Sequence, residues 1–368
     1  MTNSMALAVA AATMLSSAAL AGGSARVSTE HGIDFVTVGA PGNRHMRTQE
    51  RYYNFNLYPV TERVGRVNYR YRIGQTETTS TQWLNFVRAF GEHWEDLGGQ
   101  RLDSEFNGGT ISPATLNPNV VTDWFIHGGA EQRAVKMSWR VAAYYCNYLH
   151  NGAPVITDPA SQSVPWEVFA GGAYDASTFS QNPDASFNDQ VRRSEGARFW
   201  IPDLNEWTKA AYYDPQRYAD GNPGPYNGAI PDQEGTGGYW LYPHGSQTEP
   251  IVGNPEDGGE TNGVGPDGQP LDVGSYPTVQ TPWGALDMTG GVSEWTESIP
   301  GMYETPYGLV HSGTRYVLGS TWPFVNDQFS TGFSISSARG LRIAAAIPAP
   351  GTALVVLAAG LGLIRRRR

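Results

Sequence analysis

The run WGALDMTGGVSEWTES, residues 283–298, constrains the fold of this chain more than any other stretch. It combines two tryptophans with the adjacent glycines Gly290 and Gly291 and three acids, Asp287, Glu294 and Glu297. An amphipathic helix or strand needs neither paired glycines nor acids beside a tryptophan. Because glycine reaches backbone conformations that are closed to other residues, the run predicts a loop with one specific shape.

The composition favours a fold with many such loops. The 368 residues include 44 Gly and 25 Pro, and only 16% are charged, which is unlike a helical bundle. The 11 Trp, 19 Tyr and 13 Phe need burial, so the chain is not disordered. The length allows one large domain or two average ones.

Charge and cysteine content exclude several function classes. The formal net charge is −10, which makes the chain a poor partner for nucleic acid. With Cys146 alone, the chain has no intrachain disulfide, no cysteine-based zinc site and no two-cysteine redox site.

Both termini resemble targeting signals. Residues 1–21 form an Ala-rich apolar run that ends in an A-x-A pattern, which predicts a secretory signal peptide; the alternative is an Ala-rich helix of the domain. At the other end, Pro348 and Pro350 precede a short apolar run, 351–364. The chain then closes on four basic residues, Arg365, Arg366, Arg367 and Arg368. This end predicts a membrane segment with its arginines on the cytoplasmic side.

The middle of the chain shows strand and helix signals. Residues 32–43 predict a strand and a turn, and residues 69–74 predict a strand before a helix capped by Thr79 or Ser80. The apolar face of this helix is Trp83, Phe86, Val87 and Phe90.

Two further helices and the last strands follow. A second helix begins after Ser138 and ends at Gly152, and its inner face is Val141, Tyr145, Cys146 and Leu149. A third begins at Asp203, forms a capping box with Glu206 and ends at Pro215. Residues 215–272 are either a disordered insertion or a long loop held by something other than a core. YVLGSTWPF and GLRIA predict the last core strands.

These pieces resemble the formylglycine-generating enzyme family, the sulfatase-modifying-factor domain. The matching stretches lie between Asp34 and Ala345: ETTSTQWLNFV, VKMSWRVAAYYCNYL, IPDLNEWTKAAY, YPHG, VGSYPTVQTPWGALDMTGGVSEWTES, VLGSTW and GLRIA. The resemblance implies an α+β fold, irregular and loop-rich, related to the C-type lectins. It implies one domain over residues 22–346. The C-terminal layout resembles a PEP-CTERM sorting signal with Ala349 in place of Glu, so residues 347–368 are expected to be a sorting segment read by an exosortase.

The resemblance also implies calcium in the 283–298 loop. Side-chain oxygens of Asp287 and Glu294 and the carbonyls of Thr289 and Val292 are the matching ligands. A hard cation takes carboxylate and backbone oxygens together. Asn254 and Asp267 are the matching residues of a second calcium site. The alternative is that Asp287 and Glu294 only cap and pair inside the fold.

Three residues match structural positions of the family. Glu206 and Arg342 are expected to form a buried ion pair without a catalytic part, and Trp295 is expected to pack in the core.

The resemblance implies copper-dependent oxidation of a substrate cysteine, but this chain lacks the residues that the family uses for it. It uses two cysteines after the GGSW-like strand, and the matching residues 318–333 contain none. Copper is therefore not expected, and Cys146 is interpreted as core filler. None of the histidines forms a close pair in sequence: His31, His45, His93, His127, His150, His244 and His311.

The favoured hypothesis is an exported, envelope-sorted binding or scaffold module, stabilised by calcium, with a glycan or envelope protein as ligand. Trp240, Tyr242 and Trp322 form either a sugar platform or, as favoured, part of the core. One alternative is an active enzyme whose metal site joins His244, His311 and a carboxylate. Another is a purely structural surface protein.

Overall fold

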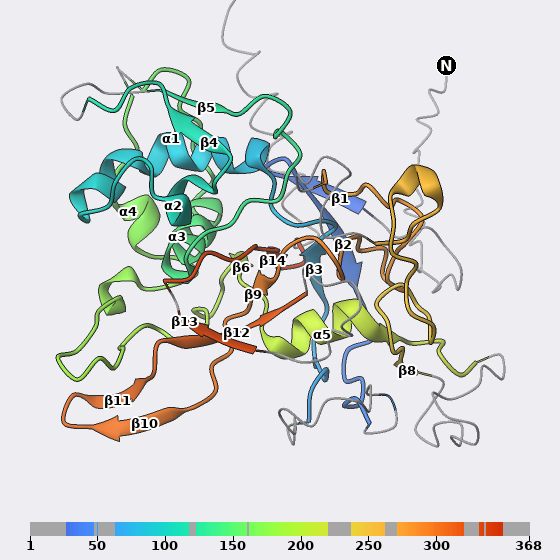
Figure 1. Cartoon of the computed structure of the whole chain (residues 1–368). Helices are drawn as coiled ribbons and strands as arrows, with labels where there is room; N and C mark the ends of the chain where they lie inside the picture. The colour runs from blue at the N-terminus through green and yellow to red at the C-terminus, as the bar shows by residue number, and fades with distance from the viewer. Residues whose placement is uncertain are drawn as a thin grey trace, which may run out of the picture.

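The structure is a computed structural model that describes residues 27–47, 50, 63–117, 123–159, 162–219, 237–261, 271–319, 331–334 and 336–348. These residues form a mixed α/β fold with few helices, open sheets and much irregular chain (Figure 1). The expected α+β, loop-rich class is confirmed. None of the helices in the described part of the chain is long and apolar enough to cross a membrane.

A five-stranded antiparallel sheet lies at the centre, in the order β1-β2-β3-β14-β6. Its strands are β1 (Val27–Glu30), β2 (Ile33–Val38), β3 (Tyr71–Gly74), β14 (Ala344–Ala345) and β6 (Phe199–Trp200). In β2, Phe35, Val36 and Val38 are fully buried. The pairing of β14 between β3 and β6 brings the end of the domain into the centre of the sheet.

Two long helices and two short ones gather on one side of this sheet (Figure 1). They are α1 (Ser80–Asp96), α2 (Ser104–Asn107), α3 (Trp139–His150) and α4 (Glu167–Ala170). Thr79, one of the two predicted caps, caps α1, and the structure adds a capping box with Gln82. Aromatic rings join α1 to α3, since Trp83 and Phe86 lie 4.7 and 5.3 Å from the Tyr145 ring.

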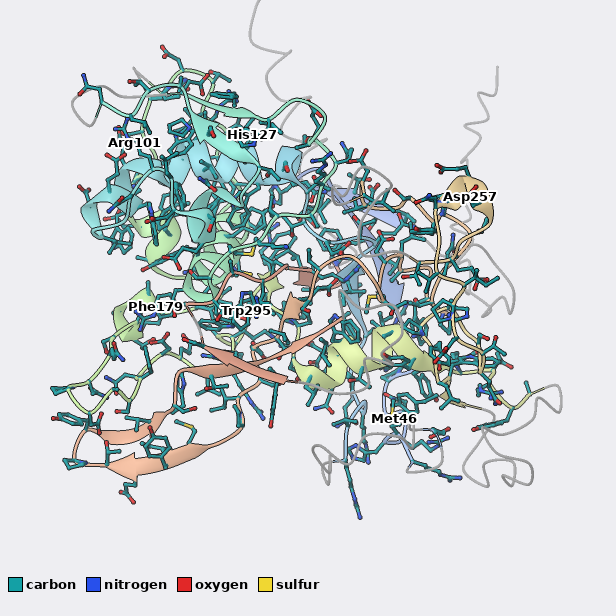
Figure 2. All side chains as sticks on the ribbon, in the orientation of Figure 1. Met46, Arg101, His127, Phe179, Asp257 and Trp295 are labelled. Carbon is teal, nitrogen blue, oxygen red and sulfur yellow. The ribbon has the colours of Figure 1, made fainter. Side chains whose placement is uncertain are left out.

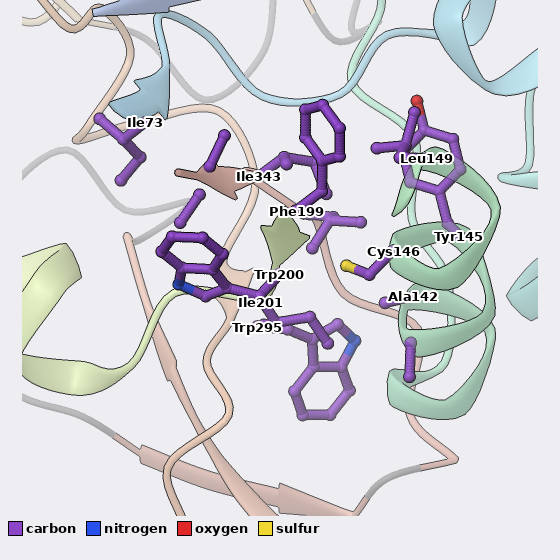
Figure 3. Packing of buried hydrophobic residues seen from close by; sticks show 14 of the residues in the cluster. Ile73, Ala142, Tyr145, Cys146, Leu149, Phe199, Trp200, Ile201, Trp295 and Ile343 are labelled. Carbon is purple, nitrogen blue, oxygen red and sulfur yellow. The ribbon is translucent and has the colours of Figure 1, made fainter. Parts of the chain in front are cut away.

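Cys146 lies in the contact between α3 and the sheet. Figure 3 shows its sulfur directed toward Phe199, Ile201 and Trp295. The side chain is fully buried, and burial raises the pKa of the thiol well above its usual range. The residue therefore packs as a small apolar side chain.

The last helix, α5 (Leu204–Tyr212), lies apart from the other four (Figure 1). Its capping box joins Asp203 and Glu206, as predicted. The predicted stop at Pro215 is wrong, because the chain leaves the helix at Tyr213 and pairs as β7 (Tyr213–Asp214) with β8 (Gly238–Tyr239).

Small sheets complete the fold. β12 (Thr314–Leu318) lies between β13 (Thr331–Ser334) and β9 (Glu294–Trp295). β10 (Met302–Thr305) and β11 (Gly308–His311) form a projecting hairpin, and β4 (Ile111–Pro113) pairs with β5 (Trp124–Ile126). Two 3-10 turns, η2 (Ala176–Thr178) and η3 (Pro255–Asp257), lie in loops.

The described parts of the long 215–272 segment pack onto the core. Tyr239 and Tyr242 are buried there, and the Tyr239 hydroxyl donates to the Gly65 carbonyl at 2.8 Å. This part of the segment is therefore a loop held by aromatic side chains. The remaining residues, 220–236 and 262–270, lie outside the described chain.

Candidate functional site

The 283–298 run is the ordered loop that the sequence predicted. It leads into β9, where Trp295 is fully buried and donates from Nε1 to the Met137 carbonyl at 2.8 Å. Figure 2 places Trp295 well inside the molecule. Gly291 has φ +61°, and a Cβ there would lie 2.4 Å from Glu77 Oε1. The loop therefore needs glycine at position 291 for its conformation and for its space.

Glu294 in this loop forms a buried ion pair with Arg342. Arg342 Nη2 lies 2.8 Å from Glu294 Oε1, and both side chains are almost fully buried. The indole of Trp207 donates to Glu294 Oε2 at 2.5 Å. Arg342 Nη1 also donates to the carbonyls of Gly74 and Gln75 at 3.0 and 2.9 Å. One guanidinium, from the residue two positions before β14, thus joins β3 to β9.

The predicted pair of Glu206 with Arg342 is wrong. Glu206 is the third residue of α5, and its capping role turns the carboxylate back toward the helix start. There it lies 3.0 Å from Arg193 Nη2. Arg342 lies instead beside Glu294, because residue 294 bridges Gly340 in parallel register. Both residues are buried, as expected, but in two separate ion pairs.

Arg193 is the centre of a charge network separate from the pair of Glu294 with Arg342. Its Nη1 lies 3.0 Å from Glu297 Oε1, and its guanidinium lies 4.2 Å from the centre of the Trp200 ring. Burial raises the pKa of Glu297 to about 8, although Arg193 lowers it. Burial, followed by the charge of Glu206, raises the pKa of Asp203 to about 7.

The predicted calcium residues of the loop have different side-chain partners in the structure. Asp287 has φ +55°, and its carboxylate accepts the Gly274 N–H at 2.5 Å. Glu294 is turned away from it toward Arg342. Glu77 also approaches Asp287, and the pKa of Glu77 is raised well above its usual range by burial and then by the charge of Asp287. Burial likewise raises the pKa of Asp287.

Three of the predicted ligands nevertheless share one small pocket. Asp287, Thr289 and Val292 line a space of about 30 Å³ together with Glu77. The Thr289 carbonyl accepts the Thr261 hydroxyl at 3.2 Å. The carboxyl groups of Glu77 and Asp287 near the Thr289 carbonyl are oxygen donors of the kind that a hard cation takes, with Glu77 in the place expected for Glu294.

The predicted second calcium site is not assembled in the described chain. Asn254 caps η3 and donates to Asp257 Oδ2 at 3.3 Å. Asp267 lies outside the described residues. Among the residues whose positions are given, no group of three or more His, Cys, Asp or Glu side chains is arranged to hold a metal.

The histidines proposed for a hidden enzyme site do not share a described cluster. His244 lines a pocket of about 10 Å³ with Glu260 and Asp287. His311 lies in β11 with its ring 6.1 Å from that of Phe187. Burial, followed by the charge of Arg315, lowers the pKa of His311 to about 4.

The aromatic residues considered for a sugar platform do not form one in the described chain. Tyr242 is buried, and the Trp240 ring lies 3.6 Å from the Arg217 guanidinium. Trp322 falls outside the described residues, as do residues 1–21, Pro350 and the four terminal arginines; Pro348 is the last described residue and is exposed.

A larger pocket lies between α5 and β12. It has a volume of about 190 Å³. Its charged and polar lining consists of Arg63, Arg192, Asp203, Asn205, Glu297 and Ser298. Its apolar and aromatic lining consists of Val64, Val191, Leu204, Ile299 and Tyr316. The pocket therefore joins the Arg193 network to solvent, and we name it the α5–β12 pocket.

Sequence reasoning missed Glu77, Arg193 and the α5–β12 pocket. Glu77 lies in a segment read only as the approach to a helix, and nothing in its spacing marks it as buried. Arg63 and Arg192 are distant in sequence and meet only in the fold. Glu206, in contrast, was found through its capping-box spacing.

Comparison with known proteins gives one family and several solved structures. Residues 24–347 match the sulfatase-modifying factor enzyme 1-like domain. No curated protein matches the chain. One of them, described as "Crystal Structure of CarF", matches over 86% of this chain and 99% of the other, at 18% identity and a TM-score of 0.39.

Proposed function

The chain belongs to the sulfatase-modifying factor enzyme 1-like family, and on that premise we propose that it is a ligand-binding module rather than a copper oxidase. The observation that carries this proposal is the α5–β12 pocket, a polar pocket beside β12 that contains no thiol. A pocket with a few converging polar groups is the default binding site of an uncharacterised domain.

The position of the cysteine supports the same conclusion. Oxidation of a substrate cysteine through Cu(I) needs soft thiolate ligands. The chain has one cysteine, Cys146, and it is fully buried against the central sheet. A thiol enclosed in this way reaches neither substrate nor metal without local unfolding.

Calcium enters the proposal as a stabiliser of the loop. Asp287 and Glu77 would hold it, with the carbonyls of Thr289 and Val292 nearby. The ion would supply positive charge between two carboxyl groups whose mutual repulsion otherwise favours protonation. Arg342 already neutralises Glu294 in the same region, so calcium would complete the charge balance of the loop.

Export and sorting complete the proposal. The Ala-rich start, the proline pair and the terminal arginines support passage to the cell envelope, transient membrane anchoring and recognition by an exosortase-like partner. A glycan or an envelope protein is the proposed ligand class. Fractionation of cells carrying the full chain, with and without Arg365–Arg368 replaced by alanine, tests this: unchanged distribution would count against a sorting role.

Two measurements on the full chain test the functional proposal. The first incubates it with copper, oxygen and a cysteine-containing sulfatase peptide, and no aldehyde product is expected. The second measures metal content and melting temperature before and after chelation, and calcium-dependent recovery is expected. Copper or iron near one per chain, or aldehyde formation, would replace the binding module with the enzyme alternative. No metal and no effect of chelation would remove calcium from the proposal.

A further inference from the structure

Two arginines of the α5–β12 pocket have no counter-ion. Arg63 and Arg192 both line the pocket, and within the described chain neither guanidinium has a hydrogen-bond acceptor or an ion-pair partner. Both side chains are exposed, at the open side of the pocket, whereas the more enclosed Arg342 and Arg193 are ion-paired with Glu294 and with Glu206 and Glu297. In a chain with 35 acids against 25 Lys and Arg, two exposed guanidiniums that face one pocket without an acidic partner are available to an external anion.

The acids of the pocket are already occupied. Glu297 accepts from the Arg193 backbone N–H at 2.9 Å and from the Tyr174 hydroxyl at 3.0 Å, in addition to its ion pair with Arg193. Asp203 accepts the Glu206 N–H at 2.7 Å as the cap of α5. Burial raises the pKa of both carboxyl groups, to about 8 and about 7. Near neutral pH the lining is therefore more positive than its residue types suggest.

The uncharged polar groups also present donors. Ser298 Oγ accepts the Leu204 N–H at 3.0 Å, which leaves its hydroxyl hydrogen for another acceptor. Asn205 Oδ1 accepts the Gly65 N–H at 2.8 Å, which leaves its NH₂ group as a donor. The ligand of a donor-rich pocket must bring acceptors.

We propose that the α5–β12 pocket binds a small hydroxylated acid through its carboxylate or sulfate group, held between Arg63 and Arg192. The inference rests on the proposed function as a binding module and adds the chemical class of its ligand. Guanidinium groups match the geometry of these oxyanions. The volume of about 190 Å³ equals roughly six water molecules, which suits one sugar-sized ring. Ser298 and Asn205 would donate to its other oxygens.

The test measures binding to the full chain at pH 7 by titration calorimetry. The probes are galacturonate, galactose 6-sulfate, galactose and inorganic sulfate. At least one of the two acidic sugars is expected to bind at least about tenfold more tightly than galactose, because a charge-assisted hydrogen bond is worth about one power of ten or more. Arg63→Gln and Arg192→Gln should each weaken that binding about tenfold.

Arg70→Gln is the matched control. Arg70 is exposed, lies in the same segment as Arg63 and does not line the pocket. Affinity within twofold of the parent chain is expected, and unchanged melting of all three variants establishes that they fold. Ile299→Trp fills the pocket and should abolish binding of every probe.

The outcomes distinguish failure of the oxyanion inference from failure of the proposed binding function. Galactose binding as tightly as the acids, blocked by Ile299→Trp but indifferent to the arginine variants, would keep the binding pocket and refute the oxyanion. Inorganic sulfate binding as tightly as the acidic sugars would refute the role of the hydroxylated ring. If no probe binds at 10 mM, within roughly the weakest range of specific recognition, the oxyanion inference is wrong, and the metal and peptide assays decide the function separately.

Discussion

Replacing Arg342 with methionine should destabilise the domain severely without altering the α5–β12 pocket. The substitution leaves Glu294 buried as an uncompensated charge and removes the Nη1 donor from the Gly74 carbonyl. Breaking a buried ion pair from one side costs about 3 to 5 kcal/mol, and an unsatisfied carbonyl adds about 1 kcal/mol. A loss of about 4 to 6 kcal/mol is a large part of the typical stability of a domain.

The measurement is the free energy of unfolding in urea for the parent chain, Arg342→Met, Glu294→Gln and the double variant. Removing both charges should recover at least about 2 kcal/mol relative to Arg342→Met, because the double variant buries no unpaired ion. Arg88→Met is the control, since its ion pair with Asp123 is partly exposed and worth at most about 1 kcal/mol. A loss below 1 kcal/mol for Arg342→Met, or additive single effects, would refute the reasoning.

Three further predictions concern other sites. Asp287→Asn should abolish the rise in melting temperature on adding calcium, and an undiminished rise would show that calcium binds at another site. His311 has a pKa of about 4 in the folded chain against 6.5 in the unfolded chain. Burial of the neutral ring therefore contributes up to about 3 kcal/mol of stability above pH 6.5, and this contribution is lost as the pH falls to 4. His311→Asn keeps an acceptor for the Gly313 N–H and should make the free energy of unfolding nearly independent of pH between 4 and 6.5. Cys146 should resist a thiol reagent in the native chain and react at once in denaturant, and rapid native labelling would contradict its burial.

Much of the fold follows from local signals in the sequence. Thr79 and Asp203 cap helices because their side chains accept hydrogen bonds from backbone N–H groups three residues later. Contacts over so short a distance along the chain can be predicted from the sequence. Gly291 likewise indicated a loop with a specific shape, because its backbone conformation, at φ +61°, is one that favours glycine. The end of α5 was misplaced because strand pairing of Tyr213 with Tyr239 depends on residues far along the chain.

The candidate site was less predictable because its contacts are long-range. Glu206 was assigned to Arg342 by resemblance, yet which arginine faces a buried acid depends on the direction in which a cap turns the side chain. Glu77 approaches Asp287 from another element, and no periodicity indicates this. The partners of buried charges are decided by packing, which spacing along the chain does not encode.

The hairpin of β10 and β11 has a consequence for solubility. Among the described strands, β10 pairs only with β11, and the hairpin exposes Met302, Tyr303 and Leu309. An open strand edge with apolar side chains is a template for pairing with a second chain. Glu304 stands in the middle of β10, and stacking a copy edge to edge would bring like charges together. This repulsion should disfavour edge-to-edge pairing of copies through β10, so that Glu304 would limit aggregation at high protein concentration.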